Sequence, residues 1–582
     1  MIHGLQDNEI IIGFFSAFFM LASLFSMGKL LTSRIPALSS GGDVAIIIGL
    51  AINHMLFLAC SLVFSGPVTV DILNGIHGIC ILLFLYFHRP AFPSIGRRYL
   101  PALILITLML VPYFFVLLSP PMNVDGLNYY LFGAEWVYYN GLRFNSFLTG
   151  YTTMPMAGEY LFAQAFGLGG QTAIVFLDAA FSLLLIRLAY LTASRLMSQH
   201  AALAFTMAML LIPQSTLYLF GSGKIDALNV YILFTAISLV LTGALSANLW
   251  MILIAYSLSC AVKYTSWIQL ALPIMVCVIM ILRYAGYRRA MLAVILPLAF
   301  AGPVIVKNKW QVNNVRAPMV SIPEQTQYVK PHVGVTNDIL DSEIKMAISK
   351  GAILRTIILK IYQNLNLMLY AILGLMLTLA YWRGVQLSRY RLPLIALLLV
   401  LLPWHAFVGM TLQPPRFILP FLILAILLCF MLAQDMLKKL HRFYERRLLL
   451  VLASIMVVAG LFHSFVQNRD FIPRYFSSKK MGLDAWYADD GKYAYSMTCA
   501  MRDGGWLKKK VLYVFPLPTG LMSMDEIPEE LTDLWRARAQ NRFEEYSPEF
   551  DYVLCSERER IRYGLQDLPV VLKRGFLVLL KR

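Results

Sequence analysis

The chain has 582 residues, of which 59% are hydrophobic and 14% are charged, and its formal net charge is +17. A soluble domain carries about a quarter charged residues, so this composition excludes an ordinary soluble enzyme and indicates a protein solvated mainly by lipid. The basic residues stand mostly in short loops beside apolar runs, where such residues orient membrane helices. The positive charge therefore does not indicate nucleic-acid binding.

The apolar runs predict about fourteen transmembrane helices, because roughly twenty apolar residues cross a bilayer core and a helix satisfies its own backbone hydrogen bonds. The first seven are expected at Ile10–Leu31, Val44–Phe64, Ile72–Phe87, Leu100–Leu118, Thr172–Leu191, Ala201–Phe220 and Leu228–Leu245. The others are expected at Leu249–Val262, Trp267–Leu282, Ala290–Val306, Leu365–Trp382, Leu392–Val408, Phe417–Leu432 and Leu448–Val466.

The first predicted span is interpreted as a membrane anchor and not as a signal peptide. No basic segment precedes it, and its positive charges, Lys29 and Arg34, lie at its far end. Lys and Arg cluster on alternate loops, as at Arg97–Arg98, Arg288–Arg289 and Lys438–Arg447. The positive-inside rule then predicts that both termini and the long loops are extracytoplasmic.

Three segments are too long to be simple connectors. The loop 119–171 has apolar residues at helical spacing and predicts helices at the membrane surface, and the loop 307–364 ends in a second such pattern. The tail 467–582 alternates short apolar runs (KVLYVFPL, DYVLCS, FLVLLKR) with charged stretches, which predicts a small α/β domain. Its Cys499 and Cys555 are either a disulfide or two separate thiols.

The predicted fold class is therefore an all-α polytopic membrane protein with a small extracytoplasmic α/β domain. We expect three parts: leading helices in 1–99, a transmembrane core in 100–466 that carries the outer loops 119–171 and 307–364, and a soluble domain in 467–582.

Asp125 is the first candidate for chemistry. It follows the fourth predicted span in a loop rich in aromatic residues and poor in other charges. A carboxylate in such surroundings can act as a general base. The alternative is an N-cap of a helix that starts at Gly126, and capping and catalysis are compatible.

Two further carboxylates lie in the same loop. Glu159 follows Pro155 and either positions a sugar hydroxyl or a metal, or is a solvated residue in the first turn of a helix. Glu135, inside the predicted surface helix, is interpreted as part of a solvated face.

Charges at other predicted outer boundaries point to an anion. Lys224 and Asp226, in GSGKIDALN, could hold and orient a phosphate or form an interfacial ion pair. Lys263, in a tight turn framed by apolar sequence, needs a polar partner such as a lipid phosphate unless it extends to the interface, because a lysine at mid-membrane costs about 3 kcal/mol. Arg416, after two prolines, could bind phosphate bidentately.

The remaining intramembrane polar residues are assigned structural roles. Asp178 and Arg187, inside the fifth predicted span, are expected to pair with other helices, and His77, His405 and His463 are expected to be packing elements. The His and Cys spacing matches no metal site, and no phosphate-binding glycine loop or nucleophile motif is recognisable.

The order of these clusters resembles the GT-C superfamily of membrane glycosyltransferases, and within it the branch of protein mannosyltransferases and lipid A aminoarabinose transferases (family 39-like). The segments that carry the resemblance are DGLNYYL from Asp125, PMAGE ending at Glu159, GKIDAL from Gly223, VKYTSWIQLALP from Val262, PVIVKNKWQVNNVRAP and RFILP from Arg416. It covers about Leu100 to Leu432, and each motif alone is short.

The resemblance implies a glycosyltransferase that moves a hexosyl or pentosyl group, with inversion, from a polyprenyl-phosphate donor to a glycan, lipid or protein acceptor at the outer face of a bacterial inner membrane. It implies Asp125 as base, with Glu159 as a second catalytic residue. Donor phosphate would be bound by Lys224, Lys263 or Arg416, and substrate would be positioned by Asp226, Tyr129, Tyr130 and Tyr264.

Two departures from the family pattern matter. Tyr130 stands where the family usually has His, and no paired acidic motif accompanies Asp125, so participation of a divalent metal ion stays open. The competing interpretations are a lipid-linked glycan polymerase or ligase, and a membrane transporter or flippase, which would show inverted repeats and charges at mid-depth.

Overall fold

The structure is a computed structural model of the full chain. It describes residues 7–33, 41–88, 100–119, 130–142, 156–211, 223–243, 245–263, 265–312, 365–408 and 419–440, scattered positions between 451 and 509, and in the tail 493–506, 511–513, 551–562, 564–575 and 577–581.

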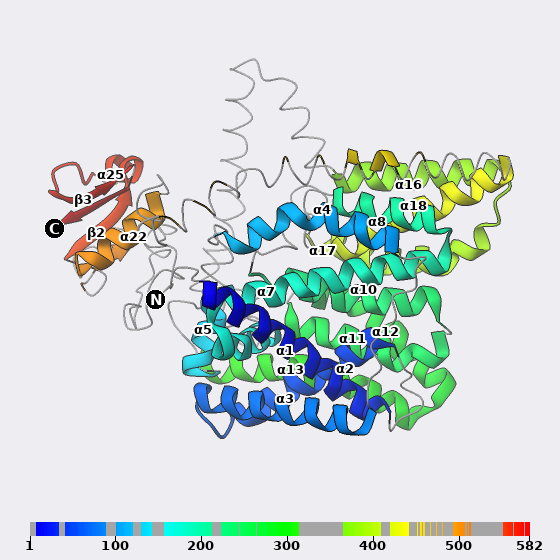
Figure 1. Ribbon diagram of the computed structural model, residues 1–582, viewed down its shortest axis with the longest axis horizontal. Coiled ribbons are helices and arrows are strands. Elements are labelled where there is room, and N and C mark those ends of the chain that lie inside the picture. Colours follow the sequence, from blue (N-terminus) through cyan, green and yellow to red (C-terminus); the bar gives the residue numbers. More distant parts are fainter. Residues whose placement is uncertain are drawn as a thin grey trace, which may run out of the picture.

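Within these residues the protein is a helical bundle of the polytopic membrane class (Figure 1). Seven helices are long and apolar enough to cross a membrane: α1 (Asp7–Thr32), α2 (Gly42–Ser61), α3 (Gly66–His88), α7 (Ala157–Leu196), α12 (Thr265–Ala285), α13 (Tyr287–Val312) and α18 (Leu419–Leu440). Shorter helices complete the bundle: α4 (Leu100–Leu118), α5 (Leu131–Asn140), α8 (Gln199–Leu211), α10 (Asp226–Thr242), α11 (Leu245–Val262), α16 (Leu365–Trp382), the 3₁₀ turn η3 (Leu387–Tyr390) and α17 (Arg391–Val408).

The predicted spans agree well with these helices. Every one except the last coincides with a described helix, and Leu448–Val466 lies mostly outside the described residues. Large apolar side chains face outward along several of them, including Phe18 (64% exposed), Leu82 (68%) and Leu298 (60%). Exposed apolar surface of this extent on a bundle is suited to lipid and not to water. The all-α polytopic fold is therefore confirmed.

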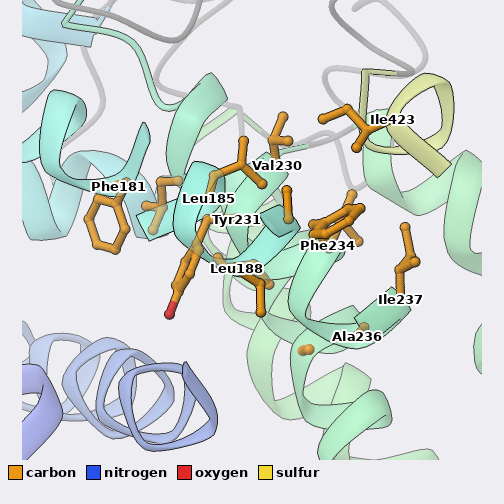
Figure 2. Packing of buried hydrophobic residues seen from close by; sticks show 14 of the residues in the cluster. Phe181, Leu185, Leu188, Val230, Tyr231, Phe234, Ala236, Ile237 and Ile423 are labelled. Carbon is orange, nitrogen blue, oxygen red and sulfur yellow. The ribbon is translucent and has the colours of Figure 1, made fainter. Parts of the chain in front are cut away.

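The bundle is centred on α7 and α10. Phe181, Leu185 and Leu188 of α7 pack against Val230 and Phe234 of α10 in one continuous buried cluster (Figure 2). Both helices are apolar on most of their circumference, as expected of helices buried inside a larger protein. This central pair is the scaffold from which the site residues project.

The leading helices α1 and α2 cross at very close range. A Cβ on Gly28 would lie 1.8 Å from the carbonyl oxygen of Ala45, and one on Gly49 would lie 2.0 Å from that of Leu24. Small residues of this kind let two membrane helices approach backbone to backbone. The first two helices are thus a tightly joined unit, and α1 and α3 also contact α7.

Several helices are longer than predicted, and the extensions of α7 and α13 bear on the site. The fifth span was expected to start at Thr172, but α7 starts at Ala157 and continues through non-helical torsions at Gly169 and Gly170, the latter at φ 64°. A glycine pair permits this break without ending the element. The tenth span was expected to end at Val306, but α13 continues to Val312. The outer loop predicted from Lys307 therefore begins later, because the polar residues NKWQV also continue the helix.

The tail forms a small α/β unit, as predicted. Its four-stranded sheet has the order β1 (Val511–Tyr513), β2 (Tyr552–Ser556), β4 (Leu577–Lys581), β3 (Val570–Arg574), with β1 parallel to β2 and the other pairs antiparallel. Helix α22 (Tyr493–Asp503) contacts β3 and β4, and α25 (Glu557–Arg562) follows β2. The three predicted apolar runs supply β1, β2 and β4. The side chain of Cys499 and the helix predicted before Asn364 lie outside the described residues.

Candidate functional site

Five charged residues gather where helices begin or end. Glu159 lies in the first turn of α7, Lys224 and Asp226 at the start of α10, Lys263 directly after α11 and Lys307 near the end of α13. All are buried, with 7%, 1%, 2%, 5% and 9% of their surface exposed. We call these residues the helix-end cluster. Concentrated charge inside a membrane bundle is costly and marks function by default.

The firmest contact in the helix-end cluster joins α10 to the turn after α11. Lys263 Nζ donates to Asp226 Oδ1, and the two side chains are 6% and 2% exposed. Lys263 is therefore held inside the protein by a carboxylate and does not extend to the interface. Asp226, expected to orient a phosphate near Lys224, pairs with a lysine of another helix turn.

A hydroxyl and amide network supports this ion pair. Ser259 Oγ donates to Asn229 Oδ1 at 2.7 Å and contacts Ser266 Oγ at 2.8 Å, and Asn229 Nδ2 lies 3.5 Å from Ser266 Oγ. These residues come from α11, α10 and α12, and all are buried. The network joins α10, which begins with Asp226, to α11 and α12, which flank Lys263. It therefore fixes the geometry of the ion pair.

The turn before α10 depends on a glycine. Gly223 has φ 61°, and its backbone N–H donates to Asp178 Oδ2 at 3.1 Å. A Cβ at Gly223 would lie 2.8 Å from the side chain of Leu131 in α5, so this turn needs both the left-handed conformation and the space. Asp178, expected to have only a structural role, thus anchors the residue beside Lys224.

Glu159 and Lys307 form the other half of the helix-end cluster. Glu159 interacts electrostatically with Lys307 and, to a smaller extent, with Lys263. Its Oε2 atom is buried and has no hydrogen-bond partner among the residues that the structure describes. Lys307 Nζ donates to Met156 Sδ at 3.6 Å. Because a buried acceptor normally finds a donor, Glu159 has an oxygen suited to a substrate hydroxyl.

The start of α7 fits closely against the start of α10 and against α5. A Cβ on Gly158 would lie 2.4 Å from the Ile225 side chain, and one on Gly133 would lie 3.5 Å from Glu159 Cγ. The residues next to Lys224 and Glu159 are therefore in contact. This packing brings three motifs of the sequence to one place.

Lys307 is the functional candidate that the sequence did not single out. It was placed at the beginning of an outer loop, where a lysine is usually solvated. The available signal was the alternation of helix direction, which puts the ends of α11 and α13 at the same end of the bundle as the starts of α7 and α10. That rule applied to Lys307 would have predicted its proximity to Glu159.

Several predicted site residues lie outside the described residues. These are Asp125, Tyr129, Tyr264 and Arg416, whose predicted roles stay predictions. Tyr130 is half-buried and stands at the beginning of α5, packed against the main core. Among the described residues, no group of three or more His, Cys, Asp or Glu side chains is arranged to hold a metal ion.

The expected partners of the structural charges are found on other helices. Arg187 pairs with Asp43 of α2 at 3.0 Å. His77 is buried and bonded to Ser23, to Asn53 Oδ1 at 3.0 Å and to Gln164 Oε1 at 2.8 Å, so it is a satisfied packing element as predicted. His405 and His463 are not described at the side-chain level.

Glu135 corrects one expectation. It was interpreted as solvated, but it is 8% exposed, because α5 lies against α7, where Gln171 Nε2 donates to Glu135 Oε2 at 3.5 Å. The prediction of a solvated face was wrong because α5 packs against both α7 and α3.

Glu135 also predicts a pH effect on stability. Burial raises the pKa of its carboxyl above the ordinary value. The folded state then holds the proton more tightly than the unfolded state, so stability falls as pH rises from the ordinary pKa through the raised one. We expect Glu135→Gln to raise the thermal midpoint in detergent at pH 8 and to have little effect at pH 4. An equal shift at both pH values would contradict this assignment.

Comparison with known proteins adds one structural likeness. No protein-family model matches the chain, and no curated protein matches it. Among solved structures, the crystal structure of ArnT from Cupriavidus metallidurans bound to undecaprenyl phosphate is similar, with 14% identity and a TM-score of 0.45 over 83% of this chain and 98% of that one.

Proposed function

We propose that the protein is a membrane glycosyltransferase that moves a sugar from a polyprenyl-phosphate donor to an acceptor at the extracytoplasmic face. The observation that carries the proposal is the helix-end cluster, in which three buried lysines and two buried carboxylates meet where helices end. A lipid-linked phosphosugar needs both groups at this depth: cations for its phosphate and acceptors for its sugar hydroxyls.

The lysines suit the donor phosphate. Lys263 directly follows α11, Lys307 lies near the end of the adjacent helix α13, and Lys224 stands two residues before α10. Charge grows on the lipid phosphate as it leaves the sugar, and fixed cations in a water-poor site stabilise that charge without reorganisation. Arg416, the further cation of the motif set, is proposed to assist from the segment before α18.

The carboxylates suit the sugar and the acceptor. Glu159, with an acceptor oxygen available among the described residues, would orient a hydroxyl of the donor or acceptor. Asp226 would hold Lys263 in place. Tyr129, Tyr130 and Tyr264 are proposed to line the sugar.

Asp125 is proposed as the base that removes the acceptor proton. It precedes α5, which lies against both Gly223 and Glu159, so the chain leads from Asp125 to the helix-end cluster. We expect Asp125→Asn to lower transfer by about 10²–10⁴-fold, the usual contribution of a general base, with donor affinity unchanged. Full transfer by a normally folded Asp125→Asn variant would overturn the assignment.

The remaining features of the proposal concern orientation and the rest of the chain. The transfer is proposed to invert the sugar, in a bacterial inner membrane with both termini outside the cytoplasm, as the distribution of Lys and Arg favours. The 467–582 domain is proposed to cover the site or bind the acceptor.

The test is transfer of radiolabelled sugar from a panel of polyprenyl-phosphate sugars by the purified protein. Transfer or donor hydrolysis that depends on the lipid phosphate supports the enzyme. Translocation of the donor across liposomes without any transfer or hydrolysis would instead support a transporter or flippase. Joining of two lipid-linked glycans would identify a polymerase or ligase.

A further inference from the structure

The leading helices hold the segment that carries Glu159. Helices α2 and α3 contact α7, and two buried histidines, His54 and His77, lie at these contacts. Both meet residues of the first turns of α7, ahead of the break at Gly169. This part of α7 is therefore held from the side by elements that lie outside the motif set.

His54 joins α2 to α7 and to α13 at once. Its Nε2 atom lies 3.2 Å from the carbonyl oxygen of Phe300, and because a carbonyl only accepts, Nε2 carries the hydrogen and donates. Its ring stacks on Tyr160 at 5.9 Å with an interplanar angle of 8°, and on Phe300 at 5.8 Å and 16°. Tyr160 directly follows Glu159 in α7, and Phe300 lies in α13 with Lys307. The His54 side chain therefore contacts both helices that carry Glu159 and Lys307.

The contact on α13 falls close to a proline inside that helix. Pro303 lies inside α13 and cannot donate a hydrogen bond to Ala299, which loosens the turn containing Phe300. A side-chain donor on a carbonyl of this turn holds it in one arrangement. Lys307 lies about two turns after Phe300, so the His54 contact sets the direction of the segment that carries Lys307.

Neighbouring contacts hold the start of α7 in register. Phe57 of α2 stacks on Tyr160 at 4.5 Å, and His77 of α3 binds the amide oxygen of Gln164, one turn later on the same face. Asn74 of α3 also donates to the Gln164 carbonyl oxygen at 3.3 Å. Helices α2 and α3 thus contact two successive turns of α7, at Tyr160 and Gln164.

We propose that His54 is a positioning residue, through which the leading helices set the separation of Glu159 and Lys307 in the helix-end cluster. The proposal rests on the proposed function for its catalytic consequence, but its structural content stands apart from the reaction. A displacement of about 1 Å in a reacting site can cost about 10²-fold in rate. His54 therefore affects turnover without touching substrate.

The kinetic test compares three substitutions. His54→Ala removes the donor and the stacking, and we expect kcat for transfer to fall about 10–100-fold with the KM for the donor lipid within about twofold. His54→Phe keeps the stacking alone and should resemble His54→Ala. His54→Gln keeps an N–H donor near the Nε2 position and should recover most of the activity.

The matched control breaks a contact between the same two helices at their other ends. Asp43 lies eleven residues before His54 on α2, about 16 Å along the helix, and pairs with Arg187 of α7. Asp43→Asn should leave kcat within about twofold. An equal loss in Asp43→Asn and His54→Ala would show general loosening of the bundle and overturn the proposal.

A second readout needs no activity. In a full chain whose native cysteines are replaced by alanine, Met156→Cys and Lys307→Cys place one thiol on each of two segments whose native side chains meet, with Lys307 Nζ 3.6 Å from Met156 Sδ. Cross-linking by a short bifunctional thiol reagent should fall by at least half in His54→Ala and His54→Phe and recover in His54→Gln. Unchanged yield would overturn the positioning role. If the native protein transfers no sugar but the yields change as expected, the proposed function fails and the positioning role holds.

Discussion

Glu159→Gln is expected to slow sugar transfer by about a hundredfold while the affinity for polyprenyl phosphate stays the same or increases. The substitution keeps the size of the side chain and replaces the carboxyl group beside Lys307 and Lys263 with an amide. Those lysines then attract the lipid phosphate at least as strongly, but the sugar or acceptor hydroxyl meets an amide, which has one acceptor oxygen in place of two and accepts more weakly. Single-turnover transfer and equilibrium binding of the lipid, measured on the same preparation, separate the two effects.

The matched control for Glu159 is Glu135→Gln. Both residues are acidic and have less than a tenth of their surface exposed, but Glu159 is part of α7 in the helix-end cluster, whereas Glu135 packs against α7 outside it. Glu135→Gln should leave transfer within about threefold. Retained transfer by Glu159→Gln, or an equal loss in both variants, would contradict the role of Glu159.

The second large effect concerns stability. Lys263→Met alone is expected to lower the free energy of unfolding by about 3–5 kcal/mol, because it removes the lysine that forms an ion pair with the buried carboxylate of Asp226. The double variant Lys263→Met with Asp226→Leu removes both charges, and should be within about 1 kcal/mol of the native protein or more stable. Denaturant titration in detergent measures both.

Sugar transfer by the same variants distinguishes a structural role of Lys263 from a role in binding the donor. The double variant should fold and still transfer no sugar, since Lys263 is proposed to bind the donor phosphate. Arg187→Met, which breaks a pair whose arginine is 51% exposed, should cost about 1 kcal/mol or less and leave transfer intact. Recovery of both stability and transfer in the double variant would reduce the Lys263–Asp226 pair to a structural element.

Much of the fold follows from the sequence because membrane helices must be apolar and must satisfy their own backbone groups. The apolar runs from Ile10 to Leu432 therefore located the described helices, and three apolar runs of the tail located strands. The errors are at helix ends. Pattern alone could not show that α7 continues through Gly169 and Gly170, because a glycine pair is typical of a boundary.

The sequence singled out four residues of the helix-end cluster but not their contacts. Lys224, Asp226, Lys263 and Glu159 were selected from residue type and membrane depth, and the structure brings them together. The sequence could not show that Asp226 pairs with Lys263, because that contact depends on the relative rotation of α10 and α11.

The remaining omissions were long-range contacts of residues that look structural. Asp178 was expected only to join helices, but it binds the backbone beside Lys224. His54 gave no signal, because a lone histidine on an apolar helix is usually a packing residue. Its role depends on the proximity of α13, which is 246 residues away in the chain.

The central claim, that the helix-end cluster binds a lipid phosphate, is tested most directly by equilibrium binding of radiolabelled polyprenyl phosphate to the protein in lipid nanodiscs. The native protein should bind it saturably, and polyprenol, which lacks the phosphate, should not compete. The folded Lys263→Met, Asp226→Leu variant should bind at least tenfold more weakly, the loss of about one charge-assisted hydrogen bond. Equal affinity of that variant, or equal competition by polyprenol, would contradict the claim.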